Sequence, residues 1–123
     1  MSAPTISQYA ALEALRVCEP YVQEMREEYN RRRQLICSGL NAIGLKTSTP
    51  GGAFYVFPDI TSSGMDDEEF AEKLLYEEHV AVVPGRSFGD SGKGFVRCSY
   101  ATEYRCIEIA LERMAAFLKR HRA

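Results

Sequence analysis

The sequence predicts an α+β domain with a small, mostly antiparallel or mixed sheet of about three strands and helices packed largely on one face. Helical periodicity fills both ends of the 123 residues, while short runs rich in β-forming residues lie between them. The predicted order is helix, helix, strand, helix, strand, strand, helix. Apolar residues make up 46% of the chain and charged residues 26%, which is enough apolar material for a real core.

The N-terminal part predicts a long helix broken near Pro20. Thr5 and Gln8 have the spacing of a capping box, and apolar residues then recur at helical intervals. A proline removes a donor inside a helix but fits its first turn, so Pro20 predicts a break and the start of a second helix. That helix is expected to end at Gly44, with Leu45 covering the end as in a Schellman motif.

Three strands are predicted in the middle of the chain, over 53–57, 80–83 and 94–100. Each of the first two is followed by a proline, which cannot donate to a sheet ladder. Between them, a helix is expected from Asp66 to about His79. Its first residues are acidic, and carboxylates are favourable at the positive end of a helix.

A last helix is predicted after Thr102, which can act as its N-cap. Its apolar stripe runs from Ile107 to Leu118. Lys119, Arg120 and Arg122 then fall at the C-terminal end, where positive charge is favourable.

Composition excludes several classes of function. The net charge of -2 offers no basic surface for nucleic acid or an anionic membrane, and no apolar stretch approaches the ~20 residues of a membrane span. The cysteines show no C-x-x-C pair or neighbouring histidine, which favours reduced thiols over disulfides or zinc; they are Cys18, Cys37, Cys98 and Cys106. We therefore expect a cytoplasmic protein.

The residues of this chain do not predict a catalytic site. The glycine-rich segment 89–94 leads into a strand rather than a helix, so it is no phosphate-binding loop. His79 is expected to close a helix, and His121 to lie in a frayed tail, so neither predicts a metal site. No serine lies in a G-x-S-x-G elbow, and no cysteine carries a nucleophile motif.

Arg97 is the unusual residue, because it interrupts an apolar run that otherwise has the pattern of a strand. A guanidinium is costly to bury unless an anion meets it, and its planar fork matches a carboxylate or a phosphate. The alternative is a position on the wet face of a half-buried strand. From the strand alone, that second explanation is the commoner one.

Several segments together resemble the C-terminal small domain of class I, fold type I, pyridoxal-phosphate aminotransferases of the aspartate aminotransferase type. The similar segments are P-G-G-A-F-Y (50–55), V-A-V-V-P-G (80–85), F-G (88–89), F-V-R-C-S-Y-A-T (95–102) and A-L-E-R-x-x-x-F (110–117). Each is weak alone, but their order and spacing are specific.

The resemblance implies that Arg97 binds the substrate α-carboxylate by a two-pronged ion pair. It also implies that Gly51 and Gly52 lie at the edge of the cleft. Phe54 is placed near the substrate side chain, with strand packing as its other explanation. Arg86 matches no functional position of the family and is expected in a solvated loop.

In such enzymes the Schiff-base lysine and the phosphate site belong to a large domain, which has no counterpart in this chain. Residues 1–19 are then expected to be a linker helix toward that large domain, and residues 20–123 the small domain. Pyridoxal phosphate is expected in the full-length parent but not on this chain alone, which should be inactive. The large domain would be its partner, and an amino acid or 2-oxo acid the substrate.

The parent is expected to be a homodimer. The isolated chain should expose an apolar stripe over residues 5–19 and self-associate. The alternative is a stand-alone binding or interaction module that kept the fold without the enzyme. An enzyme with a different active site is disfavoured, because the sequence shows no nucleophile or metal constellation.

Overall fold

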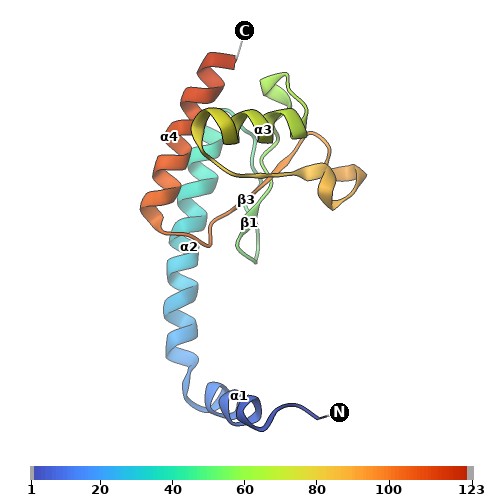
Figure 1. The fold of residues 1–123 in the computed structure, drawn as a ribbon. Coiled ribbons are helices and arrows are strands. Elements are labelled where there is room, and N and C mark those ends of the chain that lie inside the picture. The colour runs from blue at the N-terminus through green and yellow to red at the C-terminus, as the bar shows by residue number, and fades with distance from the viewer. Residues whose placement is uncertain (1, 122–123) are drawn as a thin grey trace.

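The computed structural model describes residues 2–121, and its elements follow the predicted order (Figure 1). The helices are α1 (Thr5–Val17), α2 (Glu19–Ala42), α3 (Asp67–Glu78) and α4 (Tyr104–His121), and the strands are β1 (Tyr55–Val56), β2 (Val83–Pro84) and β3 (Val96–Ser99). The strands form an antiparallel sheet in the order β1-β3-β2. The predicted α+β class with a three-stranded sheet is therefore confirmed.

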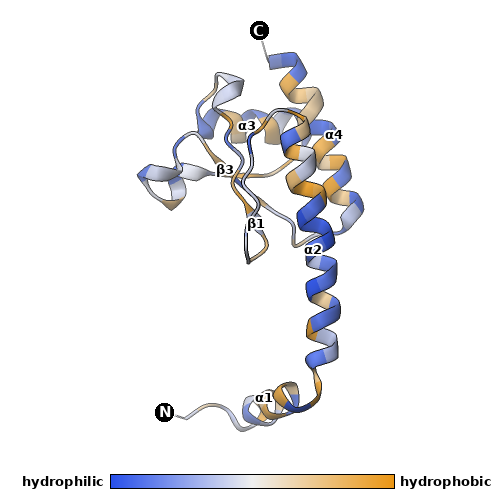
Figure 2. Ribbon diagram, turned by 180° about the vertical axis from the view of Figure 1, so that it is seen from behind, coloured by the Kyte–Doolittle hydropathy of each residue, from blue (hydrophilic) through white to orange (hydrophobic). Residues whose placement is uncertain are grey.

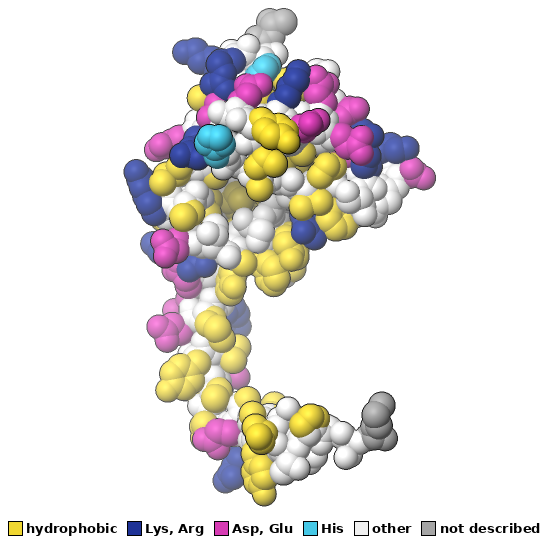
Figure 3. Space-filling view, viewed as in Figure 1, with side chains coloured by type: hydrophobic (Ala, Val, Ile, Leu, Met, Phe, Trp, Pro, Cys, Tyr) yellow, Lys and Arg dark blue, Asp and Glu magenta, His cyan; other side chains and the backbone are white. Residues whose placement is uncertain are grey.

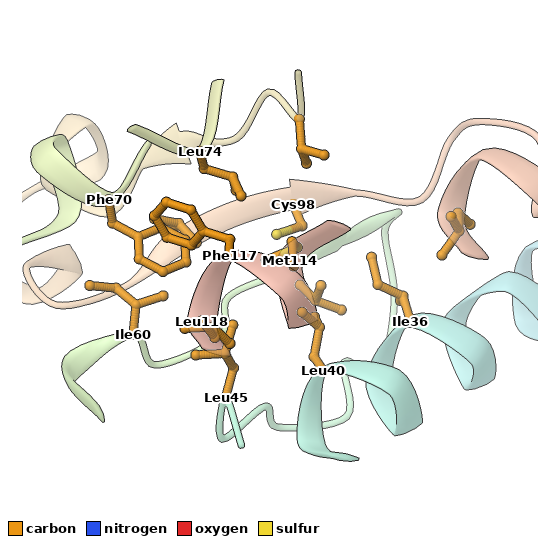
Figure 4. Close-up of a cluster of buried hydrophobic side chains, with 14 of the residues drawn as sticks. Ile36, Leu40, Leu45, Ile60, Phe70, Leu74, Cys98, Met114, Phe117 and Leu118 are labelled. Carbon is orange, nitrogen blue, oxygen red and sulfur yellow. The ribbon is translucent and has the colours of Figure 1, made fainter. Parts of the chain in front are cut away.

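The core lies between the sheet and the helices. Helices α2 and α4 run side by side along one flank of the sheet (Figure 1). Figure 4 shows side chains from α2, α3, α4 and β3 pointing toward one another. Along β3, Val96 and Cys98 are buried in this core while Arg97 and Ser99 are not, because successive strand residues face opposite sides. Arg97 therefore lies on the face of the sheet that turns away from the core.

The predicted break near Pro20 is confirmed. Helix α1 ends at Val17, α2 begins at Glu19, and Pro20 occupies the first turn of α2. At the other end of α2, Gly44 has a φ of 87°, and the N–H of Leu45 donates to the carbonyl of Leu40 at 2.9 Å. This is the expected Schellman motif.

The predicted capping box at Thr5 is wrong. Pro4 precedes the first helical residue, and no side chain caps α1. The Gln8 amide donates instead to the carbonyl of Ala3 at 2.8 Å, so it ties the segment before the helix to the first turn.

Helix α1 and the first turns of α2 form an arm, residues 5–25, that stands away from the body (Figure 2). No residue of α1 is buried. Hydrophobic side chains nevertheless cover much of the arm in Figure 3, and Ile6 and Leu15 are 84% and 89% exposed. The exposed apolar stripe expected over residues 5–19 is present.

The second strand is shorter and later than the predicted 80–83. His79 takes the left-handed conformation at the end of α3, with a φ of 55°, and the N–H of Val80 turns back to the carbonyl of Leu74 at 3.4 Å. Val80 thus belongs to the helix end. The strand instead includes Pro84, which an edge strand such as β2 tolerates.

The first strand is also shorter than the predicted 53–57. Ala53 has a φ of 60°, which is incompatible with extended backbone, so β1 begins only at Tyr55. At the last helix, α4 begins at Tyr104, and Glu103 rather than Thr102 therefore directly precedes it.

The end of α4 is held rather than frayed. The His121 ring lies 4.5 Å from the Phe117 ring, and its Nε2 is 2.8 Å from a carboxylate oxygen of Glu77. Arg120 pairs with Glu77 and Glu78 of α3. The prediction for His121 was wrong because the helix packs against α3 up to its last turn. Arg122 lies outside the described residues.

Burial separates the four cysteines, all of which are free thiols. Cys37 and Cys98 are buried, Cys18 is partly buried and Cys106 is exposed. Burial raises the pKa of Cys98 to about 12, so this thiol stays protonated. Between residues 2 and 121 no cluster of three metal-binding side chains occurs, and no helix there is long and apolar enough to cross a membrane.

Candidate functional site

Arg97 lies in the centre of the sheet, on its middle strand. Its cross-strand neighbour on β2 is Val83, and Tyr55 on β1 pairs with Ser99 of β3. Paired residues and residues two apart share one face of a sheet, so Tyr55 and Arg97 emerge on the same side. The register thus brings an aromatic ring beside the guanidinium.

Two rings contact the partly buried Arg97 side chain. Its guanidinium carbon is 4.3 Å from the centroid of the Tyr55 ring and 4.6 Å from that of Phe88. Such cation–π contacts engage the face of a guanidinium, while its N–H donors lie at the edge. Phe88 in turn meets Phe57 edge to face, with ring centroids 5.6 Å apart. We call Tyr55, Phe57 and Phe88 the aromatic cluster.

Arg97 has no acidic partner among residues 2–121, since none of their carboxylates lies within ion-pairing distance of it. A charge held against aromatic rings, with its donors unmatched by any acceptor in the described part of the chain, is suited to receive an anion. The arrangement can therefore bind a carboxylate or a phosphate.

Phe54 lies next to this group but not over the guanidinium. Its ring is 4.4 Å from Tyr55 and 6.2 Å from Tyr29 of α2, and the side chain is 38% exposed. The structure thus brings Phe54 and Arg97 together only through Tyr55.

Tyr55 and Phe88 are the neighbours of Arg97 that sequence reasoning missed. In the sequence, Phe88 is noticeable only as part of the F-G motif (88–89). Its contact with Arg97 depends on the turn over residues 85–88. Strand alternation puts Tyr55 and Phe57 on one face, but only the register of β1 against β3 places Tyr55 beside Arg97.

The sequence led us to expect Arg86 in a solvated loop, but the structure pairs it with acidic residues of α3. Its guanidinium donates to Asp67 Oδ1 from Nε at 2.9 Å and from Nη2 at 2.7 Å. Further contacts reach Glu68 at 2.8 Å and Asp66 at 3.3 Å. The difference from Arg97 is clear, because Arg86 is fully engaged by acids of its own chain.

The turn that precedes β1 is anchored from two sides. The Tyr100 hydroxyl donates to the carbonyl of Ala53 at 2.8 Å, and Nη1 of Arg33 donates to that of Pro50 at 3.1 Å. Gly51 and Gly52 lie in this turn and line a hollow of about 380 Å³ against α2. The anchors place the start of β1, and with it Phe54 and Tyr55.

A larger hollow of about 430 Å³ lies between α2, α4 and residues 79–82. It is mostly apolar and is lined by buried residues such as Leu40, Ile107 and Met114. Arg97 does not line it. This hollow is therefore separate from the candidate site.

The residues described here do not fit pyridoxal phosphate. Covalent attachment of that cofactor needs a lysine amine, and the four lysines are Lys46, Lys73, Lys93 and Lys119. Lys73 and Lys93 are paired with Glu69 and Asp90 on the surface, and none of the four lines either hollow. The two hollows and the Arg97 site therefore bring no lysine amine into place for covalent attachment of this cofactor.

Comparisons with known proteins give consistent matches over nearly the whole chain. The family "Aminotransferase class I and II" matches residues 1–114. The aspartate aminotransferase of Pyrococcus abyssi is 50% identical over 117 residues, which cover 94% of this chain and 30% of that protein. The aromatic-amino-acid aminotransferase 2 of Thermococcus litoralis is likewise 50% identical, over 94% of this chain and 30% of its own length.

Solved structures give the same result. The aromatic aminotransferase from Pyrococcus horikoshii superimposes with a TM-score of 0.89 at 50% identity, over 92% of this chain and 31% of that one. The Thermus thermophilus aspartate aminotransferase with maleate gives 0.84 at 47% identity, over 94% and 30%. The chain thus spans about a third of the length of the relatives it matches. It belongs to the class I and II aminotransferase family and is aspartate aminotransferase-like, as its motifs predicted.

Proposed function

We propose that this chain is the small-domain part of a pyridoxal-phosphate-dependent aminotransferase, in which Arg97 binds the α-carboxylate of the amino-acid or 2-oxo-acid substrate. The observation that carries the proposal is the state of Arg97. Two rings hold its guanidinium, and the described part of the chain offers it no acidic partner. A relative of known structure was solved with maleate, a dicarboxylate, which supports the same class of ligand.

Solvation favours an anion at Arg97. The partly buried guanidinium loses hydration that no acceptor among residues 2–121 replaces, so an anion that arrives there gains a strong pair. A carboxylate matches the guanidinium fork with two parallel hydrogen bonds, which fixes its orientation as well as its position. Arg97 would thereby orient the substrate carbon toward the rest of the active site, and Phe54 would border the substrate side chain.

The remaining machinery would come from a large domain. Pyridoxal phosphate, bound there through a lysine, supplies the electron sink of transamination. The contribution of this chain is to hold the substrate carboxylate and to exclude water as the small domain closes. By itself the chain should not transaminate, and the parent is expected to be a homodimer.

The exposed arm gives the chain a means of attachment. Its apolar side chains over residues 5–17 would pack on the large domain, and the break at Cys18 would serve as the hinge between the two domains. Residues 1–19 would then be the linker, and residues 20–123 the domain that moves.

The test is an NMR titration of this chain with maleate, following the Nε–Hε resonances of its arginines. We expect the Arg97 resonance to shift saturably, and Arg97→Lys to weaken binding about tenfold or more, because lysine cannot form the two-pronged pair. Arg120→Lys is the matched control, since Arg120 is already paired with Glu77 and Glu78.

An unmoved Arg97 resonance, or equal affinity in Arg97→Lys and wild type, would overturn the assignment. A second measurement tests inactivity. The chain supplied with pyridoxal phosphate, aspartate and 2-oxoglutarate should form no glutamate, and turnover that depends on the chain would contradict the proposal.

A further inference from the structure

We propose that Arg86 is a positioning residue for the carboxylate site. By tying the short 3-10 turn η2 (Gly85–Phe88) to the start of α3, it holds the Phe88 ring over the Arg97 guanidinium. The inference rests on the proposed function of Arg97, and it extends that function to a residue for which the sequence offered no role.

The first step is the strength of the tie. Both carboxylate oxygens of Asp67 accept hydrogen bonds from Arg86, Oδ1 from the guanidinium and Oδ2 from the backbone N–H at 2.8 Å. The Asp67 side chain is only 1% exposed, so the carboxylate of this pair is shielded from water, while the Arg86 side chain stays partly exposed. Glu68 adds a second carboxylate from the same helix turn.

The second step is the rigidity of the turn. The Gly85 N–H donates to the carbonyl of Phe95 at 2.9 Å, and a Cβ on Gly85 would lie 2.0 Å from the carbonyl oxygen of Gly92. The turn η2 therefore presses against the next turn, η3 (Asp90–Gly92), backbone to backbone. Such a unit moves as one body rather than bending between Arg86 and Phe88.

The third step links the two side chains. The Gly89 N–H donates to the carbonyl of Arg86 at 3.1 Å, which closes the turn around Phe88. A displacement of Arg86 therefore carries Phe88 with it. Phe88 is 47% exposed and its ring meets the Phe57 ring edge to face, so packing alone constrains it weakly.

The consequence concerns how well Arg97 is organised before it binds. With Phe88 in place, the guanidinium lies against two rings and its rotamer is restricted, so little entropy is lost on binding. Without the tie to Asp67, the ring would leave the guanidinium part of the time. Carboxylate binding would weaken although Arg97 itself is unchanged.

The experiment uses the 123-residue chain and two readouts. The first is the nuclear Overhauser effect between Phe88 ring protons and the Arg97 side chain. The second is affinity for maleate. In Arg86→Gln we expect loss of the Overhauser effect and about threefold weaker binding, the scale of one partly exposed cation–π contact.

A double-mutant cycle separates positioning from general destabilisation. Phe88→Leu should weaken maleate binding to the same extent, and adding Arg86→Gln to it should weaken binding no further, because Arg86 acts through Phe88. Arg86→Lys keeps the charge and should recover part of the effect. Arg120→Gln removes another arginine pair with α3, at the opposite end of that helix from Asp67, and should change neither readout.

Each outcome decides between the claims. An Overhauser effect that persists in Arg86→Gln, or additive losses in the double variant, would overturn the positioning role. If Arg86→Gln fails to fold by circular dichroism, Arg86→Lys carries the comparison with a smaller expected loss, because one ammonium cannot replace both guanidinium donors to Asp67. If wild type shows no maleate response at Arg97, the proposed function fails, while the Overhauser comparison still decides whether Arg86 positions Phe88.

Discussion

Asp67 and Arg86 form a closed pair in which the carboxylate of one meets both the guanidinium and the backbone N–H of the other. They lie 19 residues apart and join the start of α3 to the turn that carries Phe88. Hydrogen bonds from the Arg86 guanidinium lower the pKa of Asp67 to about 2, from an ordinary value of 3.8.

The first prediction is an acid dependence of stability. Because the pKa of Asp67 is lower in the folded state, the unfolded chain binds the proton more tightly, and acid favours unfolding. The contribution of the pair is complete above about pH 4 and is lost as the pH falls toward 2. Asp67→Asn should lower the free energy of unfolding at pH 7 by about 2 kcal/mol, the worth of a charged hydrogen bond.

Urea denaturation at pH 7 and pH 3 measures this effect. The variant should lose less stability between the two pH values than wild type does. Asp90→Asn is the control, because Asp90 is exposed and pairs only with Lys93, three residues away. Equal acid losses in wild type and Asp67→Asn would show that the pair does not carry the dependence.

A second prediction concerns the contact of Gly85 with Gly92. A Cβ on Gly85 would lie 2.0 Å from the carbonyl oxygen of Gly92 and 2.6 Å from that of Phe95. Both are backbone atoms, which cannot rotate away from the clash as a side chain can. Gly85→Ala should therefore destabilise the chain by about 2 kcal/mol or more. Urea denaturation at pH 7 gives the value.

Gly52→Ala is the matched control for that substitution, since a Cβ there meets nothing within 4 Å. It should change the free energy of unfolding by less than about 0.5 kcal/mol. Similar values for the two variants would mean that η2 and η3 separate easily, which would also weaken the case for a rigid turn.

Local signals in the sequence predicted most of the helices correctly. Pro20 marked the break because proline acts on its own backbone, and Gly44 marked the end of α2 because a left-handed residue is needed there. Asp66 was expected to start α3, and its side chain does accept a hydrogen bond from the N–H of Glu69 at 2.9 Å. Each of these effects is confined to one turn of helix.

Some misses depend on contacts between distant segments, whereas those at Thr5, Ala53 and His79 are local backbone effects. The short β2 follows from His79, a non-glycine residue in the left-handed conformation, which no motif marks. The acids at the start of α3 had an adequate local explanation, so nothing in the sequence pointed from Asp67 to Arg86. Arg97 was placed on a strand correctly, but its contact with Tyr55 depends on the register of β1 and β3, and its contact with Phe88 depends on the turn η2.

The last prediction concerns the exposed arm. Ile6 and Leu15 are among its most exposed apolar residues, and burying them offers a gain of about 1.5–3 kcal/mol each. In the absence of a large domain, a second copy of the chain can bury them, so the chain should self-associate with rising concentration. Sedimentation velocity over a hundredfold range of concentration detects this, and Ile6→Glu/Leu15→Glu should shift the chain toward monomer. Ser7→Glu, which adds charge at an exposed polar position of the same helix, should leave the association unchanged. If the double variant associates as strongly as wild type, the copies meet through another surface and the arm does not drive self-association.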